Sequence, residues 1–287
     1  MSVTACTSPV LFLGLVMASL PAGAGAQSEP AGIRMFTESR KASIVPVSQM
    51  QQQDLVDPKR QALRVNEEAV ALVLRGSVGQ GLQKLKQAHL LDPHNPTVMY
   101  NLAGVYISEG KPSEALPMME GAVNAQPNDI AFLHRLAQAY TLTGKTKQAV
   151  ETYEKIALID PLSESTLLKL GTLYGVTEQW DKAEATLRRA HQALGDDAQV
   201  LHSLGSILIV RGKYAEAIEV LTRAQSKVKD AKNSIALGIA YESLGRREKA
   251  LQHYREAREF GERGDDLAVH IRELEKLTEP AAVRARN

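Results

Sequence analysis

The most constraining feature of this chain is a repeat of 34 residues that begins near residue 62 and continues through most of its length. Leucines recur at that interval, with a last step of 33. Each is followed at once by Ala or Gly, and a large residue stands four positions after it. A fixed period of this length means that one supersecondary unit is repeated and that neighbouring units bury each other's apolar faces. The leucines are Leu102, Leu136, Leu170, Leu204 and Leu237.

A second small residue recurs with the same spacing further along each unit, and another large residue follows it by four positions. Two helices approach closely only where their side chains are small, so each unit is expected to be a pair of packed helices. Aromatic residues make up only 5% of the chain while alanine and leucine are abundant, a composition that favours helices. The second small residues are Ala115, Ala149, Ala183, Ala217 and Ala250.

These positions resemble the tetratricopeptide repeat family, a helix-turn-helix repeat with the same signature of small and large residues. The resemblance implies an all-α, right-handed superhelical solenoid of six repeats, with a capping helix at 265–279 and a tail at 280–287. The first repeat is atypical because Glu68 and Gly81 replace Leu and Ala, as is common where one face of a terminal repeat is uncovered. The repeats are expected near 62–95, 96–129, 130–163, 164–197, 198–230 and 231–264.

Residues 139–146, AYTLTGKT, fit a relaxed form of the phosphate-binding loop that ends in Gly144, Lys145 and Thr146. The repeat register explains them differently, because glycine recurs here between the two helices of a unit and is followed each time by Lys or Arg. A glycine that ends a helix adopts the left-handed conformation, and a basic residue favours the negative end of the helix. A phosphate loop also requires a preceding strand, whereas AYTLT belongs to an expected helix. We therefore predict a helix C-cap here and no nucleotide site.

The first 26 residues differ in kind from the rest of the chain. An apolar run precedes the small residues Ala24, Gly25 and Ala26, which is the form of a secretory signal peptide cleaved after Ala26. No Lys or Arg precedes the run, so an uncleaved leader on a cytoplasmic protein with a misassigned start is the alternative. We expect a periplasmic or secreted protein, with a polar, flexible arm at 27–61 and no stable transmembrane segment after cleavage.

Motifs for catalysis or metal binding are absent from the sequence. There is no H-E-x-x-H, G-x-S-x-G or dinucleotide-binding pattern, and the single cysteine, Cys6, lies in the leader. The net charge of +1 provides no basic field for nucleic acid. His134 and His202 have no activating partner visible in the sequence and stand two repeats apart, too far to share a metal. We therefore predict a non-enzymatic protein with no cofactor, no metal and no nucleic acid partner.

The resemblance implies that the first helix of each repeat, helix A, lines a concave groove in which a partner binds. Its second, fifth, ninth and twelfth residues are expected to face that groove. Family members that hold chaperone C-termini use Lys, Arg and Asn there, but the fifth position here reads Tyr, His, Leu, His, Ile, so no carboxylate clamp is expected. A peptide or helix that docks with an apolar face fits better. The predicted partner-binding residues are Tyr100, Ile107, His134, Gln138, Leu168, Thr172, Gln199, His202, Ser206, Lys232 and Ile239.

The sequence thus favours a non-enzymatic scaffold in the periplasm or cell envelope that binds another protein in its groove. The resemblance implies a role in assembling an envelope or secretion complex, as exported members of the family commonly have. Two alternatives stay open: a structural protein that associates with itself, and a cytoplasmic regulatory adaptor.

Overall fold

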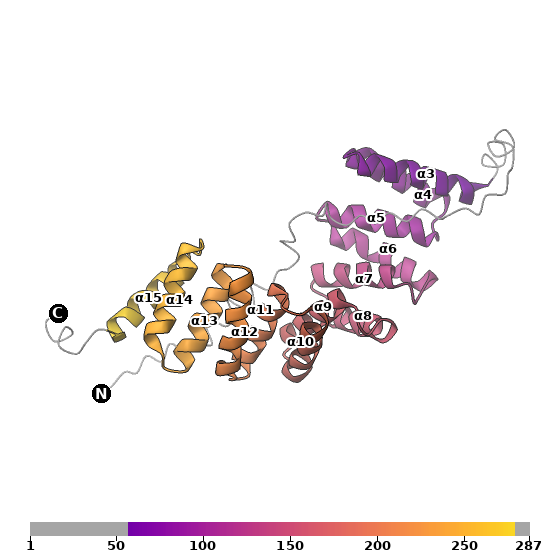
Figure 1. Ribbon diagram of the computed structural model, residues 1–287. Coiled ribbons are helices and arrows are strands. Elements are labelled where there is room, and N and C mark those ends of the chain that lie inside the picture. Colours follow the sequence, from indigo (N-terminus) through magenta and orange to yellow (C-terminus); the bar gives the residue numbers. More distant parts are fainter. Residues whose placement is uncertain (1–56, 279–287) are drawn as a thin grey trace, which may run out of the picture. The chain divides into compact units, whose positions relative to one another are not determined.

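The computed structural model of the chain describes residues 57–278, which fold into helices with no strand among them (Figure 1). This confirms the predicted all-α solenoid of helical repeats. The leader expected at 1–26, all but the end of the arm, and the tail at 280–287 lie outside the described residues. The described residues form two compact units, 57–161 and 162–278.

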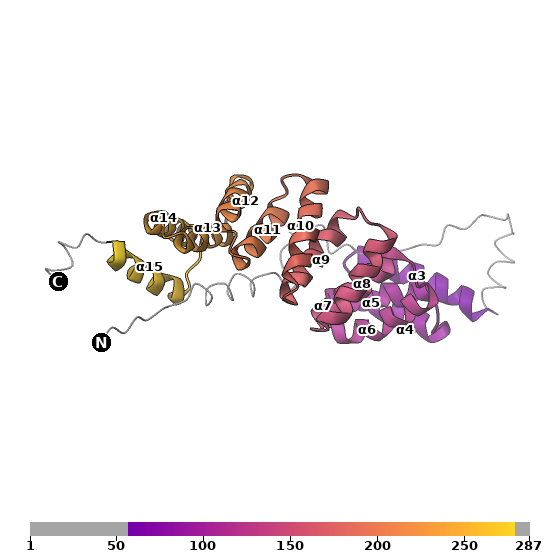
Figure 2. The ribbon, with the colours of Figure 1, turned by 90° about the horizontal axis from the view of Figure 1, so that it is seen from below.

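The first unit contains three helical hairpins, each made of a helix A and a helix B. Every helix packs against the next one along the chain, so neighbouring hairpins share a core (Figures 1 and 2). Successive A helices also contact one another directly. The A and B helices alternate as α3 (Pro58–Leu74), α4 (Val78–Leu91), α5 (Pro96–Ser108), α6 (Pro112–Ala125), α7 (Ile130–Leu142) and α8 (Thr146–Ile159).

The second unit contains three further hairpins and one last helix, packed in the same sequential way (Figures 1 and 2). Its helices are α9 (Glu164–Val176), α10 (Trp180–Leu194), α11 (Ala198–Val210), α12 (Tyr214–Lys227), α13 (Ala231–Ser243), α14 (Arg247–Glu259) and α15 (Asp265–Thr278).

The small positions predicted from the sequence lie where helix A and helix B of one hairpin meet. The helix B alanines, such as Ala183 and Ala217, are fully buried. On helix A the second unit has glycine at this position, and a Cβ added to Gly205 would lie 2.5 Å from Cγ of Leu221. The helices are therefore too close there for any side chain, so the large residue of helix B fills the space.

The turn between α7 and α8 explains the phosphate-loop pattern. Gly144 has a φ of 73°, and the backbone N–H of Lys145 donates to the carbonyl of Tyr140 at 2.8 Å. The N–H of Gly144 donates to the carbonyl of Thr141, which completes the helix-ending arrangement known as a Schellman motif. A helix precedes this turn, so the predicted C-cap is confirmed. Lys145 itself is the N-cap of α8, and its Nζ lies 5.9 Å from the ring centroid of Tyr140.

Most A helices begin at an Asp or Asn whose side chain accepts hydrogen bonds from the first turn. Asp129 accepts from the N–H of Phe132 at 3.0 Å, and Asp57 accepts from Lys59 at 3.0 Å. Because Asp57 is followed by Pro58, a residue suited to the first helical position, α3 begins there. The array therefore starts four residues before the expected residue 62, and residues 58–61 belong to it and not to the arm.

The last helix, α15, begins one repeat length after α13 and corresponds to the helix A of a further repeat. Its apolar side is covered, with Leu267, Ile271 and Leu274 buried. The exposed Arg272 stands where every helix A from α5 to α13 has Ala or Gly, so a following helix B is excluded from close packing. We refer to α15, which lies at the position of the predicted capping helix, as the cap helix.

Candidate partner-binding surface

In the first unit, the predicted binding residues lie on α5 and α7 but differ in accessibility. Gln138 is exposed, and Ile107 and His134 are partly buried. Tyr100 is only 4% exposed, and its ring lies 5.2 Å from that of Phe132. The partner contact expected of Tyr100 is therefore corrected, because this side chain belongs to the core.

Arg135, which the sequence reasoning passed over, explains the burial of Tyr100. Its guanidinium lies over the Tyr100 ring, 3.7 Å from the centroid, and Nη1 donates to the Tyr100 carbonyl at 3.0 Å. The guanidinium also fills the space beside Gly104, where an added Cβ would collide with it. Arg135 thus connects α7 to α5 through a cation–π contact and a charge-assisted hydrogen bond.

The A helices of the first unit are also joined by a buried amide pair. Nδ2 of Asn101 on α5 donates to Oδ1 of Asn66 on α3 at 2.9 Å, and both side chains are buried. Oδ1 of Asn101 is buried without a hydrogen-bond partner among the described residues. Buried polar groups are costly unless paired, so these side chains specify how α3 and α5 align.

His134 presents a neutral imidazole at pH 7. Burial lowers its pKa, and the charge of Asp160 opposes that effect only in part. The ring packs edge-on against Tyr153, with centroids 5.8 Å apart. His134 is therefore a partly buried polar group of this surface.

In the second unit, three A helices carry the remaining predicted residues. Gln199 and Lys232 are exposed, and Leu168, Thr172 and His202 are partly buried. Ser206 and Ile239 are only 2% and 1% exposed. The expected partner contacts of Ser206 and Ile239 are thus also corrected. Ile239 lies in a stretch of α13 that is buried on every side, and Ser206 Oγ donates to the carbonyl of His202 within α11.

We use the name helix A row for the predicted residues that keep accessible surface, taken separately in each unit. In the first unit the row contains Ile107, His134 and Gln138, and in the second it contains Leu168, Thr172, Gln199, His202 and Lys232. It combines amide, imidazole, ammonium, hydroxyl and small apolar groups, which suits hydrogen bonding to a peptide backbone together with limited apolar contact.

A buried carboxylate in the second unit is the largest feature that the sequence reasoning missed. Glu184, on α10, is 3% exposed and follows the second small alanine of its repeat. The other repeats from the second onward have Leu, Val or Ile at that position, so an acidic residue there departs from the core pattern. That departure is visible in the repeat register and would have identified the site.

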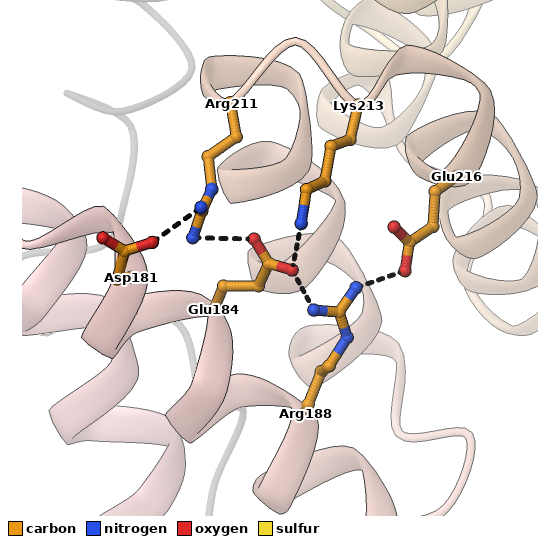
Figure 3. Close-up of polar contacts among 6 residues, drawn as sticks. All are labelled: Asp181, Glu184, Arg188, Arg211, Lys213 and Glu216. Atoms are coloured by element: carbon orange, nitrogen blue, oxygen red, sulfur yellow. Dashed lines mark hydrogen bonds and ion pairs between the residues drawn. The ribbon is translucent and has the colours of Figure 1, made fainter.

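Three cations surround Glu184 (Figure 3). Lys213 Nζ lies 2.7 Å from one carboxylate oxygen, which Arg188 also contacts, and Arg211 Nη1 lies 3.0 Å from the other. Two further acids balance the charge, since Asp181 pairs with Arg211 and Glu216 with Arg188. The ion-pair cluster connects α10 to the turn before α12, and consists of Asp181, Glu184, Arg188, Arg211, Lys213 and Glu216.

Within residues 57–278, no three His, Cys, Asp or Glu side chains are grouped so that they could hold a metal ion. In the same range, no helix combines the length and apolar character needed to cross a membrane.

Families described as tetratricopeptide repeats match the chain at residues 72–131 and 106–170, at 168–234 and at 235–263. These matches run from α3 past the end of α14, through all six hairpins. The chain therefore belongs to the tetratricopeptide repeat family. No protein of curated function matches it.

Solved structures share the fold. A crystal structure of MamA protein has a TM-score of 0.54 and 24% identity, over 57% of this chain and 90% of that one. A tetratricopeptide repeat protein from Parabacteroides merdae has a TM-score of 0.55 and 18% identity, over 74% and 98%. YrrB, described as a TPR protein with an unusual peptide-binding site, has a TM-score of 0.56 and 20% identity, over 66% and 97%.

Proposed function

We propose that this protein is a non-enzymatic scaffold that binds a peptide segment or helix of another protein on its helix A row. Repeats of this family generally serve as interaction modules, and their A helices commonly form the surface that a partner meets. The observation that carries the proposal is the row in each unit: Gln199 and Lys232 are exposed at the second residue of the successive helices α11 and α13, and Gln138 is exposed on α7 of the first unit. YrrB, which shares the fold, is described as having a peptide-binding site.

We further propose that the protein works in the periplasm or cell envelope, in the assembly of an envelope or secretion complex. The support is the form of the first 26 residues, with an apolar run and the small residues Ala24 and Ala26 at the expected cleavage position. Amino-terminal sequencing of the protein purified from cell fractions tests this directly. A chain that begins at Gln27 in the envelope fraction is expected, whereas an intact leader in the cytoplasm would favour a regulatory adaptor.

Extension of the array by a second copy is disfavoured at both ends. At the first hairpin, Glu68 replaces the helix A leucine and pairs in a partly exposed position with Lys84 at 2.8 Å. At the last helix, Arg272 replaces the small residue. Stacking another copy on either end would bury these charges, so binding of a different protein is preferred over self-assembly. Light scattering on the purified protein is expected to show a monomer.

The binding proposal is tested by crosslinking and affinity purification from envelope fractions with two matched triple variants. The first removes exposed row residues, Gln138→Ala with Gln199→Ala and Lys232→Ala. The control removes exposed helix B residues, Glu114→Ala with Lys147→Ala and Glu219→Ala. A partner captured by the wild type and the control but not by the row variant is the expected result. Equal capture by both variants would place the binding site elsewhere.

A further inference from the structure

The first unit has exposed apolar side chains along one edge, where its B helices end. Leu90 and Leu158 occupy the same repeat position in the last turns of α4 and α8, and they are 80% and 83% exposed. Single exposed leucines are ordinary, but exposed apolar residues that recur at one edge form a candidate interaction surface. We use the name connection strip for the exposed apolar residues in the last turns of α4, α6 and α8. They are Leu90, Ala125, Leu158 and Ile159.

The surroundings of the connection strip expose no charged side chain. Among residues 90–95, 124–129 and 158–161, which end the B helices and follow them, no Asp, Glu, Lys or Arg is exposed. The aspartates in these stretches are partly buried, and Asp92 accepts a hydrogen bond from Nδ2 of Asn95 at 3.2 Å. An apolar segment can therefore lie on this edge without removing an exposed charge from water.

The corresponding edge of the second unit is charged. Lys227 and Lys229 are exposed where α12 ends, and Glu259 and Arg263 are exposed where α14 ends. The uncharged edge is thus a property of the first unit and not of the repeat.

The chain that precedes the array joins it beside the connection strip. α3 begins at Pro58 and is followed by α4 after a tight turn, so the two helices are antiparallel and the start of α3 lies next to the end of α4. Leu91 in the last turn of α4 confirms this, because it packs with Val65 near the start of α3 and with Val98 near the start of α5. The residue before Asp57 therefore leaves the array at one end of the strip.

The sequence of that preceding chain matches the strip. Residues 42–53 include no charged residue, and apolar side chains stand at 44–47 and again at Leu55 and Val56. Ile44 lies 13 positions before Asp57, and an extended chain of that length spans about 40 Å. Packed helices lie about 8–10 Å apart, so a strip across three hairpins is on the order of 30 Å long. The segment is long enough to cover it.

We propose that residues 44–56 of this chain dock along the connection strip of the first unit and bury its leucines. The occupant is the chain's own arm because a short tether holds the segment at a local concentration of about millimolar, far above that of a second copy in solution. Apolar contact between two uncharged surfaces supplies the attraction. This proposal does not depend on the function of the helix A row.

Photo-crosslinking of the purified full-length chain tests the contact. Benzoylphenylalanine introduced at Val47 is expected to bond, within the same molecule, to peptides that contain Leu90 or Leu158. The same group at Ser28, far from the docked segment, is the matched control and is expected to show no preference for these peptides. Mass spectrometry of the monomer fraction identifies the joined peptides.

Substitutions on the strip test its energetic role. Leu90→Ser with Leu158→Ser is compared with Leu74→Ser with Leu244→Ser, which changes two exposed leucines away from the strip. Thermolysin cleaves before apolar residues, and its rate of cleavage before Met50 reports how often the segment is undocked. The strip variant is expected to be cleaved about tenfold faster than the wild type, from the lost burial of two leucines, and the control at the wild-type rate.

A variant of the arm keeps the result independent of the fold of the array. Ile44→Ser with Val47→Ser changes no residue of the helices and is expected to speed cleavage before Met50 by a similar factor. Equal cleavage rates in the wild type and in both variants would overturn the proposal. Crosslinks between isotopically labelled and unlabelled copies would overturn it by making a second copy the occupant. Crosslinks from position 47 to other surfaces would also overturn it and leave the strip to a different protein.

Discussion

The turn between α7 and α8 in the first unit and the turn between α9 and α10 in the second follow the same backbone course with different residues. Gly144 occupies the left-handed position in the first, with φ of 73°, and Glu178 occupies it in the second, with φ of 59°. Glycine adopts this conformation without strain, whereas a residue with a Cβ pays about 1–2 kcal/mol. The repeat packing therefore imposes the turn, even on a residue that does not favour it.

The same two units differ at the position after the second small alanine. In α6 of the first unit it is Leu116, buried against Met119 and its neighbours. In α10 of the second unit it is Glu184, buried among Arg188, Arg211 and Lys213. One position thus accepts either an aliphatic side chain or a carboxylate, on condition that the surrounding residues supply apolar contact or positive charge.

The largest loss of stability is expected when the side chain at this position does not match its surroundings. Leu116→Glu places a carboxylate in an apolar site without the three cations that Glu184 has, and an uncompensated buried charge destabilises by about 3–5 kcal/mol. Urea unfolding followed by circular dichroism is expected to show early loss of helix. Hydrogen exchange should localise that loss to the first unit.

The reciprocal change is its control. Glu184→Leu restores the aliphatic residue of the other repeats and leaves cations that already reach solvent, so we expect a change within about 1.5 kcal/mol. The only tryptophan of the chain, Trp180 at the start of α10, reports this transition by fluorescence. A loss of stability as large as that of Leu116→Glu would mean that the charge interactions of the ion-pair cluster, and not the volume of the side chain at position 184, hold α10 in place.

The second largest effect concerns the small position of helix A. Gly238→Ala in the second unit adds a Cβ that collides with the Tyr254 ring, and overpacking of this kind costs about 1–3 kcal/mol. Ala103→Gly in the first unit removes a Cβ that fits, which is expected to cost about 1 kcal/mol through helix propensity. Thermal unfolding of the two variants measures how much stability each has lost. A stabilised Gly238→Ala would show that α13 and α14 have room to separate.

These contrasts also show which parts of the molecule were predictable from the sequence. The small alanines and Gly144 were predictable, because their role depends on local packing that recurs in every repeat. Arg135 was not predictable, because it acts through a partner on another helix. Glu184 is visible in the sequence as an acidic residue at a core position, but the three cations that surround it are not. The burial of Tyr100 was missed for the same reason, since Arg135 covers its ring from a neighbouring helix.

A smaller change in stability is expected at the turns, with opposite signs for the two variants. Glu178→Gly removes a Cβ from a left-handed residue and is expected to stabilise the second unit by about 0.5–1 kcal/mol, after the entropy lost to glycine is subtracted. Gly144→Ala introduces the same strain in the first unit and is expected to destabilise it by about 1 kcal/mol. The midpoints of urea unfolding measure the change in stability of both variants. Shifts of the same sign in the two variants would contradict a shared left-handed turn.

The smallest effect is a dependence of stability on acid that arises from one carboxylate of the second unit. Glu242 on α13 accepts hydrogen bonds from Tyr254 and from His270 of the cap helix, both at 2.8 Å, whereas Thr141 occupies the equivalent place in the first unit. Burial alone would raise the pKa of Glu242, but the bonds from His270 and Tyr254 outweigh it and lower the pKa.

A lowered carboxyl pKa contributes stability that is complete above the ordinary value of 4.5 and is lost as the pH falls through the folded value. The wild type should therefore lose more stability than Glu242→Gln between pH 6 and the acid limit of folding, by up to about 1 kcal/mol for a partly exposed pair. Trp180 fluorescence in urea at each pH measures the difference, because the other carboxylates are common to both proteins. Parallel curves would mean that α15 is held by Leu267, Ile271 and Leu274 alone, and that its polar contacts to the last hairpin add no stability.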